Sequence, residues 1–299
     1  MNPYIGETAA LLTSLAFSVT SSMFTLAGRK VGSAVVNRTR LVLAVVLLSL
    51  THLIFLGSLF PWNAEPQRWM WLSLSGIIGL VLGDAFLFQA FVWIGPRLSM
   101  LMMSLAPVIS TLAAWMFLDE YLSWMQLLGI GLTLSGIAWV SMEGNGKQKA
   151  ANRDYLRGIL FGLGAATGQA LGLVLSKNGL YGDFSPISAN LIRMLSATIV
   201  LWAVTLLQRK ALSTFERLKS NRRSMFLIFA GVVSGPFLGV SLSLFAIQKT
   251  AIGVASTLMA LPPVFLLPIS YIFFKERFGW GAVAGTLVAV AGVALLFLV

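Results

Sequence analysis

One carboxylate lies deep inside an apolar stretch and is the strongest candidate for chemistry in this sequence. Asp84 comes about 15 residues into the stretch 69–94, which at about 1.5 Å per residue places it near the middle of a membrane-spanning helix. A lone charged carboxylate at that depth is costly, so Asp84 must be protonated, paired with a cation or hydrated. Each of these states suits binding of a solute or a proton. The alternative is a structural ion pair that fixes helix packing.

Polar side chains in other apolar stretches could act together with Asp84. Arg40 and Arg193 are candidate ion-pair partners, and Arg40 has the more similar estimated depth. Neutral groups complete a predicted substrate-binding set: Ser21, Gln89, Gln169 and Asn190. A few directed hydrogen bonds in a mostly apolar pocket suit an amphipathic small molecule. Each neutral group alone is more often a hydrogen bond between helices.

Two prolines and a histidine complete the residues of interest. Pro107 and Pro263 lie near the middle of apolar stretches, where a missing backbone hydrogen bond is expected to kink the helix and could line or gate a pathway. His52, the only histidine, lies near the end of its stretch and is expected at the membrane surface. With one histidine and no cysteine, we expect no metal ion, no cofactor and no enzymatic activity.

The composition identifies the surroundings of these residues. The chain has 299 residues, of which 58% are hydrophobic and 10% charged, too few charges for a water-soluble domain. The apolar stretches have the length of membrane-spanning helices. We therefore predict an all-α integral membrane protein with ten transmembrane helices at about 5–27, 36–58, 69–94, 99–118, 124–143, 156–178, 187–208, 225–248, 253–274 and 278–299.

The net charge of +11 predicts orientation rather than nucleic-acid binding, because the basic residues are spread over short loops and form no continuous basic face. Most of them lie in or beside the odd-numbered loops. The exceptions are Arg68, Lys177, Lys249 and Arg193. The positive-inside rule therefore places the odd-numbered loops in the cytoplasm and both termini outside.

The sequence repeats itself. Residues 105–140 align without a gap on 261–296, an offset of 156, which superposes Pro107 on Pro263 and Glu120 on Glu276. At an offset of 153, Asn37 and Arg40 superpose on Asn190 and Arg193. We predict repeats at 1–143 and 156–299 joined by a cytoplasmic linker at 144–155. Because each repeat has five helices, the second must be inverted relative to the first.

Glycine-spaced final helices follow the Pro-Val and Glu positions in both repeats, at Gly129, Gly136, Gly285 and Gly292. In these features the chain resembles the EamA-type family of the drug/metabolite transporter superfamily. The resemblance implies a ten-helix transporter of small metabolites, such as amino acids or their analogues, in the cytoplasmic (inner) membrane, with export the commoner direction.

The expected function is a secondary transporter that works by alternating access. Asp84 is the candidate for proton coupling. A flippase or transporter of a lipid or polyprenyl-phosphate is the alternative, with Arg40 and Arg193 as phosphate ligands. A channel would need a continuous polar lining, and an ATP-driven pump would need a nucleotide-binding loop that the chain lacks. The expected partners are the solute, the lipid bilayer and protons, in a monomer or homodimer.

Overall fold

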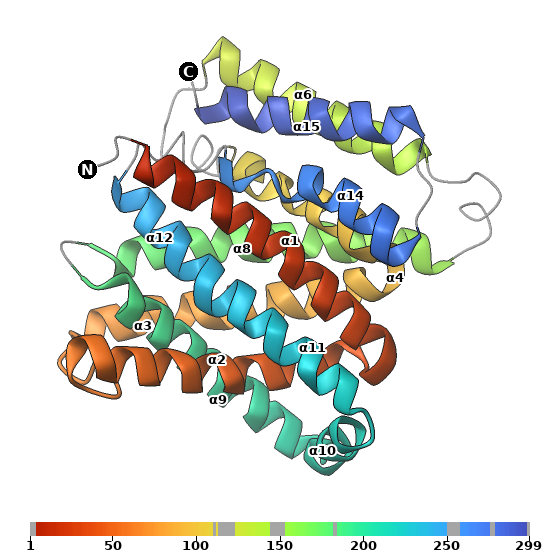
Figure 1. The fold of residues 1–299 in the computed structure, drawn as a ribbon. Coiled ribbons are helices and arrows are strands. Elements are labelled where there is room, and N and C mark those ends of the chain that lie inside the picture. The colour runs from red at the N-terminus through yellow and green to blue at the C-terminus, as the bar shows by residue number, and fades with distance from the viewer. Residues whose placement is uncertain are drawn as a thin grey trace.

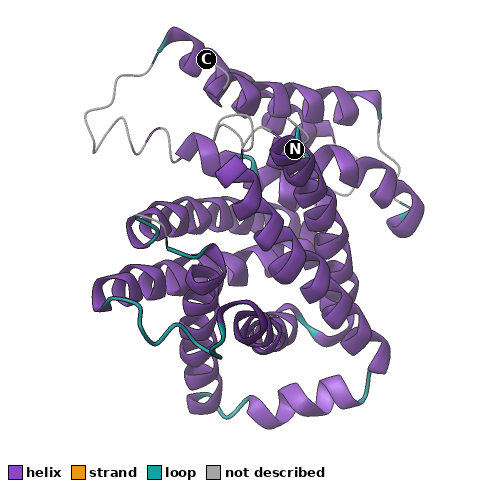
Figure 2. Cartoon of the chain, turned by 60° about the vertical axis from the view of Figure 1, so that its left-hand side comes forward, coloured by secondary structure: helices purple, strands orange, loops and turns teal. Residues whose placement is uncertain are grey.

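The computed structural model describes residues 4–109, 112, 123–143, 153–181, 184–249, 258–275 and 279–297. All regular elements within these ranges are helices (Figure 2). They are α1 (Ile5–Val31), α2 (Ser33–Leu56), α3 (Pro66–Gly76), η1 (Ile77–Gly83), α4 (Asp84–Met103), α6 (Trp124–Glu143), α8 (Arg153–Gly179), α9 (Pro186–Leu207), α10 (Ala211–Lys219), α11 (Arg222–Val232), η2 (Val233–Gly239), α12 (Val240–Lys249), α14 (Pro262–Phe274) and α15 (Trp280–Phe297).

Within the described ranges, six helical segments are long and apolar enough to cross a membrane, and three further apolar helices are shorter. One of the six, Pro66–Met103, has 38 residues and joins the predicted stretch 69–94 to the start of the stretch 99–118. Gly95 interrupts it with a non-helical backbone (φ 78°, ψ 168°), a conformation that glycine adopts at little cost. This break falls where the stretches 69–94 and 99–118 were expected to separate. The total of ten spans stays a prediction.

Equivalent elements of the two repeats pack against one another. Helix α6 lies along α15 (Figure 1), and α2 contacts α9. Other contacts are exchanged between the repeats, because η1 of the first packs on α8 of the second while η2 of the second packs on α1 of the first. The two halves therefore interlock.

Both repeats contain a π-helix at the same position. The segments η1 and η2 have seven residues each, and they are separated by 156 residues, the offset of the sequence repeat. A π-helix carries one residue more per turn than an α-helix and is frequent at functional sites. Asp84 follows the first π-helix directly, and Val240 follows the second.

Pro107 and Pro263 each come shortly after an interruption of a helix. Pro263 is the second residue of α14, after a break at residues 260–261, and Pro107 is the third residue of a helical stretch that follows a break at Ser104. The expected role of these prolines in kinking a helix or gating a pathway stays a prediction. A proline fits the first turn of a helix because the amide hydrogen that it lacks has no intrahelical partner there.

Glycines bring η1 and α8 into backbone contact. A Cβ atom on Gly168 would lie 2.7 Å from the Gly83 Cα, and one on Gly172 would lie 3.1 Å from the Gly79 Cα. Side chains larger than hydrogen would push these helices apart. Such small-residue seams are the usual way for membrane helices to approach closely. The seam positions Asp84, which follows Gly83, beside α8.

The basic segment 209–224, expected to be a loop, contains helix α10. It lies across the end of the longer helices (Figure 2) and exposes the side chains of Leu212 and Phe215. Glu120 and Glu276, which the repeat pairs, lie outside the described residues.

Candidate functional site

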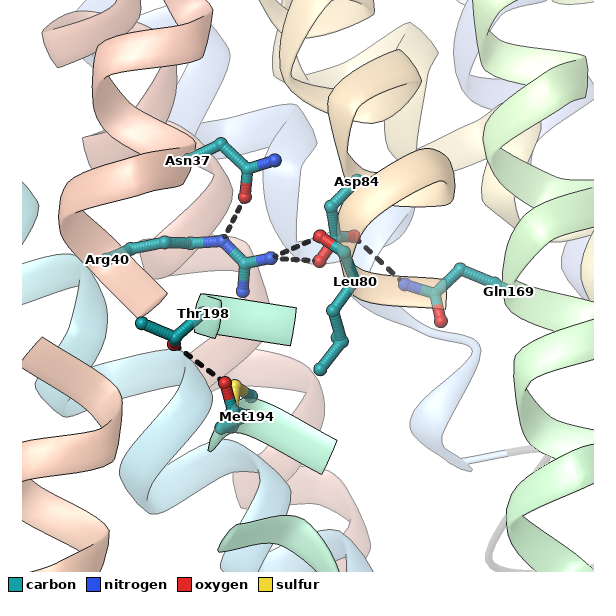
Figure 3. Close-up of polar contacts among 7 residues, drawn as sticks. All are labelled: Asn37, Arg40, Leu80, Asp84, Gln169, Met194 and Thr198. Carbon is teal, nitrogen blue, oxygen red and sulfur yellow. Dashed lines mark hydrogen bonds and ion pairs between the residues drawn. The ribbon is translucent and has the colours of Figure 1, made fainter. Parts of the chain in front are cut away.

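Asp84 is the centre of a buried polar cluster at the seam between the repeats. As the first residue of α4, it is only 4% exposed. Arg40 of α2, also 4% exposed, forms an ion pair with the Asp84 carboxylate through Nη2 (Figure 3). Two buried charges are stable together only when further hydrogen bonds satisfy their remaining polar atoms.

Those further bonds come from both sides of the ion pair. Arg40 Nε donates to Asn37 Oδ1 at 3.0 Å, and Arg40 Nη2 also approaches the Leu80 carbonyl oxygen at 3.4 Å. The Arg40 guanidinium lies 5.0 Å from the centre of the Phe88 ring, within the range of a cation–π contact. Leu80 belongs to η1, so the π-helix itself supplies an acceptor to the site.

The second repeat contributes Gln169 of α8. Its Nε2 donates to Asp84 Oδ1 at 3.0 Å (Figure 3). The carboxylate therefore accepts hydrogen bonds from a helix of each repeat, Arg40 on one side and Gln169 on the other. A change in the protonation of Asp84, or its capture by a bound molecule, would alter a contact that joins the halves.

Arg193 and Asn190 of α9 occupy the positions equivalent to Arg40 and Asn37. Asn190 Nδ2 donates to the Pro236 carbonyl oxygen in η2 at 3.4 Å, and Pro236 is the repeat equivalent of Leu80. Arg193 interacts electrostatically with Asp84. Among the described residues, however, no hydrogen-bond partner is found for Arg193 Nε or for the buried Asn190 Oδ1.

The structure does not bring the whole predicted set together. Gln89 Oε1 accepts a hydrogen bond from Ser33 Oγ at 2.5 Å, and Ser21 Oγ donates to the Ser18 carbonyl oxygen of its own helix at 2.9 Å. Within the described residues, neither side chain hydrogen-bonds to Asp84. For Gln89 and Ser21, and for the rest of the set, binding of a solute stays a prediction.

His52 is buried within the protein near the end of α2, and its expected depth at the membrane surface stays a prediction. It is 3% exposed, and its ring nitrogens lie 2.5 Å from the Ser58 carbonyl oxygen and 3.0 Å from Ser188 Oγ. Ser188 belongs to α9, so this pair also joins the repeats. The sequence did not predict this contact, because the position of His52 along its helix says nothing about the direction in which it faces. A cavity of about 310 Å³ adjoins His52 and Ser188.

The same end of the molecule carries a second contact between the repeats that the sequence analysis missed. The Arg68 guanidinium lies 3.8 Å from the centre of the Tyr181 ring and 4.7 Å from that of Phe184. The Tyr181 hydroxyl donates a hydrogen bond to Glu65, and this bond raises the pKa of Tyr181. Arg68, the one basic residue between the predicted stretches 36–58 and 69–94, therefore contributes to a contact between residues far apart in the sequence.

The π-helices were also missed, although a signal was present. Gly79 and Gly83 repeat as Gly235 and Gly239 at the offset of 156, and these glycines fall inside the two π-helices. A π-helix leaves no distinctive periodicity over seven residues, so the spacing alone could not reveal it.

Comparisons with known proteins agree on the type of fold. A family model described as the EamA-like transporter family matches residues 4–142 and 156–298, once in each repeat. No curated protein sequence matches the chain. A solved structure, titled only as the crystal structure of a protein, has a TM-score of 0.63 at 16% sequence identity, over 97% of this chain and 96% of the other. At that identity the likeness shows the fold alone.

Proposed function

The chain belongs to the EamA-like transporter family, and from that premise we propose that it is a secondary transporter that exports a small metabolite across the cytoplasmic membrane by alternating access. The family makes it a membrane transporter of the drug/metabolite type. The direction, the proton coupling and the class of solute are our proposals. An amino acid or an analogue is the solute that the resemblance suggests.

The observation that carries the proposal is the position of Asp84 between the repeats. Its carboxylate is bound by Arg40 from one repeat and by Gln169 from the other. Alternating access requires contacts between the halves that can be made and broken. Protonation of Asp84 removes its charge and weakens the hydrogen bond that its carboxylate accepts from Gln169 of the other repeat, so we propose that proton binding favours separation of the halves on one side.

We propose the corresponding architecture of ten spans in two inverted five-helix repeats, with both termini outside. The matched π-helices, the pairing of α6 with α15 and the exchange of contacts between the repeats support this arrangement. In such folds the substrate site lies near the middle of the membrane at the interface of the repeats. The Asp84 cluster lies at that interface.

Transport assays in proteoliposomes test the proposal. The wild-type protein is expected to accumulate a labelled amino acid or metabolite when a pH gradient is imposed, and Asp84→Asn is expected to abolish the pH dependence while remaining folded in the membrane. Unchanged pH dependence in Asp84→Asn would overturn proton coupling at this residue. Transfer of a polyprenyl-phosphate between leaflets, with no transport of soluble metabolites, would instead support the flippase alternative.

A further inference from the structure

The two repeats differ at one equivalent site. In the first repeat, Arg40 Nε donates to Asn37 Oδ1, and the Arg40 guanidinium is neutralised by Asp84. In the second, the matching atoms, Arg193 Nε and Asn190 Oδ1, have no hydrogen-bond partner among the described residues. Val240 occupies the position that Asp84 has in the first repeat. The second site has the arginine and the asparagine but lacks the carboxylate.

The charges of the cluster are therefore unbalanced. Arg40 and Arg193 are both close enough to Asp84 to interact with it electrostatically, so with all three ionised the cluster carries two positive charges and one negative charge. Of these two arginines, Arg40 is the one for which the described residues show an ion pair with Asp84. The buried Nε of Arg193 has no acceptor among the described residues, and a bidentate oxyanion would satisfy the guanidinium well.

Arg193 is less enclosed than its counterpart in the first repeat. Arg193 and Val240 are both partly exposed, in contrast to the buried Arg40 and Asp84. Helix α12, which begins at Val240, contacts α9, which carries Arg193. Arg193 also lies close to η1 and α8. A Cβ atom added to Gly79 would lie 3.7 Å from Arg193 Nη2 and 3.8 Å from Gln169 Oε1. Arg193 thus reaches the cluster while part of it remains accessible.

We propose that the transported solute carries an anionic group, a carboxylate or a phosphate, and that this group binds Arg193 at the position that a carboxylate occupies in the first repeat. A hydrogen-bond donor of the same solute would reach the free Asn190 Oδ1. The inference rests on the proposed function only in taking the bound anion as the transported solute. It names the class of solute that the site accepts.

Ligand binding to the purified protein tests the anion site without any transport. The probes are inorganic phosphate, an organic phosphate monoester, a zwitterionic amino acid, a simple carboxylate, the matching neutral amide and the matching amine. We expect the melting temperature to rise with anions but not with the amide or the amine. Phosphate-only stabilisation would identify a phosphorylated solute, and stabilisation by carboxylates would identify a carboxylic acid or amino acid.

Substitution of Arg193 should remove that binding. Arg193→Gln is expected to weaken binding of the anion by about 10- to 100-fold, the usual effect of losing a charged hydrogen bond. Arg193→Lys keeps the charge and should retain partial binding. Arg222→Gln removes an exposed positive charge elsewhere and should leave binding unchanged. The proposal is wrong if no anion stabilises the wild-type protein, or if Arg193→Gln binds it as well as wild type does.

A second variant supplies the missing carboxylate from the protein itself. In Val240→Asp, the new carboxylate is expected to pair with Arg193. The melting temperature of the ligand-free protein should then rise, and anions should no longer raise it further. Val240→Asn has a similar shape without the charge and should keep the shift. If Val240→Asp binds anions as tightly as wild type does, Arg193 is not their site.

The outcomes separate this inference from the proposed function. Suppose that anion binding depends on Arg193 but that the protein transports none of the bound anions in proteoliposomes. That result would support the anion site and contradict the transport of its ligand. Transport of a neutral or cationic solute that anions do not inhibit would support the transporter and overturn the anion site.

Discussion

At the residue scale, the sequence made the charged members of the site visible and favoured Arg40 by depth as the partner of Asp84, but it did not show the direction in which each side chain faces. Asp84, Arg40 and Arg193 could be found because charges are rare in membrane-spanning stretches and usually functional. Which arginine contacts the acid depends on how each helix is rotated, and a single sequence contains no direct record of that rotation. Gln169 lies against Asp84, whereas Gln89 contacts Ser33, although both looked equivalent in the sequence.

The ion pair predicts a characteristic pattern of stability. Arg40→Gln leaves Asp84 buried without its cation, and breaking a buried pair in this way costs about 3 to 5 kcal/mol. The double variant Arg40→Gln/Asp84→Asn removes both charges and is expected to recover a large part of that loss. Reversible unfolding in mixed detergent micelles measures both variants against wild type. The single variant Asp84→Asn completes the cycle. If the double variant loses as much unfolding free energy as Arg40→Gln and Asp84→Asn lose together, the two side chains are not coupled.

At the element scale, the apolar stretches predicted most of the helices because about 20 apolar residues are needed to cross a bilayer. Helix α6 has the predicted bounds, and α9 differs from its prediction by one residue at each end. Two kinds of detail were hidden. The short helix α10 has too few apolar residues to stand out, and the break at residues 260–261 moves Pro263 from the middle of a helix to its start.

The glycine seam between η1 and α8 gives an element-scale prediction. Gly168→Ala places a methyl group 2.7 Å from the Gly83 Cα, and because backbone cannot move as freely as a side chain, we expect a loss of about 1 to 3 kcal/mol in unfolding free energy. Thermal unfolding monitored by tryptophan fluorescence measures the change.

The control is Gly131→Ala in α6, where nothing lies within 4 Å of the new methyl group. Since alanine favours helix over glycine by about 1 kcal/mol in an exposed helix, this variant should be neutral or slightly more stable. Equal losses in the two variants would contradict close packing at Gly168.

At the scale of the whole molecule, the internal repeat was the most informative feature of the sequence. Matched positions such as Pro107 and Pro263 predicted two equivalent halves, and the matched π-helices are consistent with that symmetry. The exchange of contacts, with η1 on α8 and η2 on α1, could not be predicted, because a repeat states that two halves are alike without stating how they meet.

The proposed orientation can be tested directly because the chain has no cysteine. A single cysteine at Asn63 or Ser220, both exposed loop positions, can be labelled with a membrane-impermeant maleimide in intact cells. We expect Asn63→Cys to react from outside and Ser220→Cys to react only after the membrane is permeabilised. The reverse result would place both termini in the cytoplasm, and reaction of both sites in intact cells would indicate dual insertion.

The π-helix before Asp84 determines the direction, around the helix axis, in which the Asp84 carboxylate points. Each residue along a helix turns the following side chains by about 100°, and a π-helical turn holds one residue more than an α-helical turn. Deleting one residue from Ile77–Gly83 would therefore restore ordinary α-helical phase and swing Asp84 away from Arg40 and Gln169, without changing a single side chain of the cluster. The additional residue of the π-helical turn therefore sets the rotation of the residues that follow it. In the other repeat, η2 sets the rotation of Val240 in the same way.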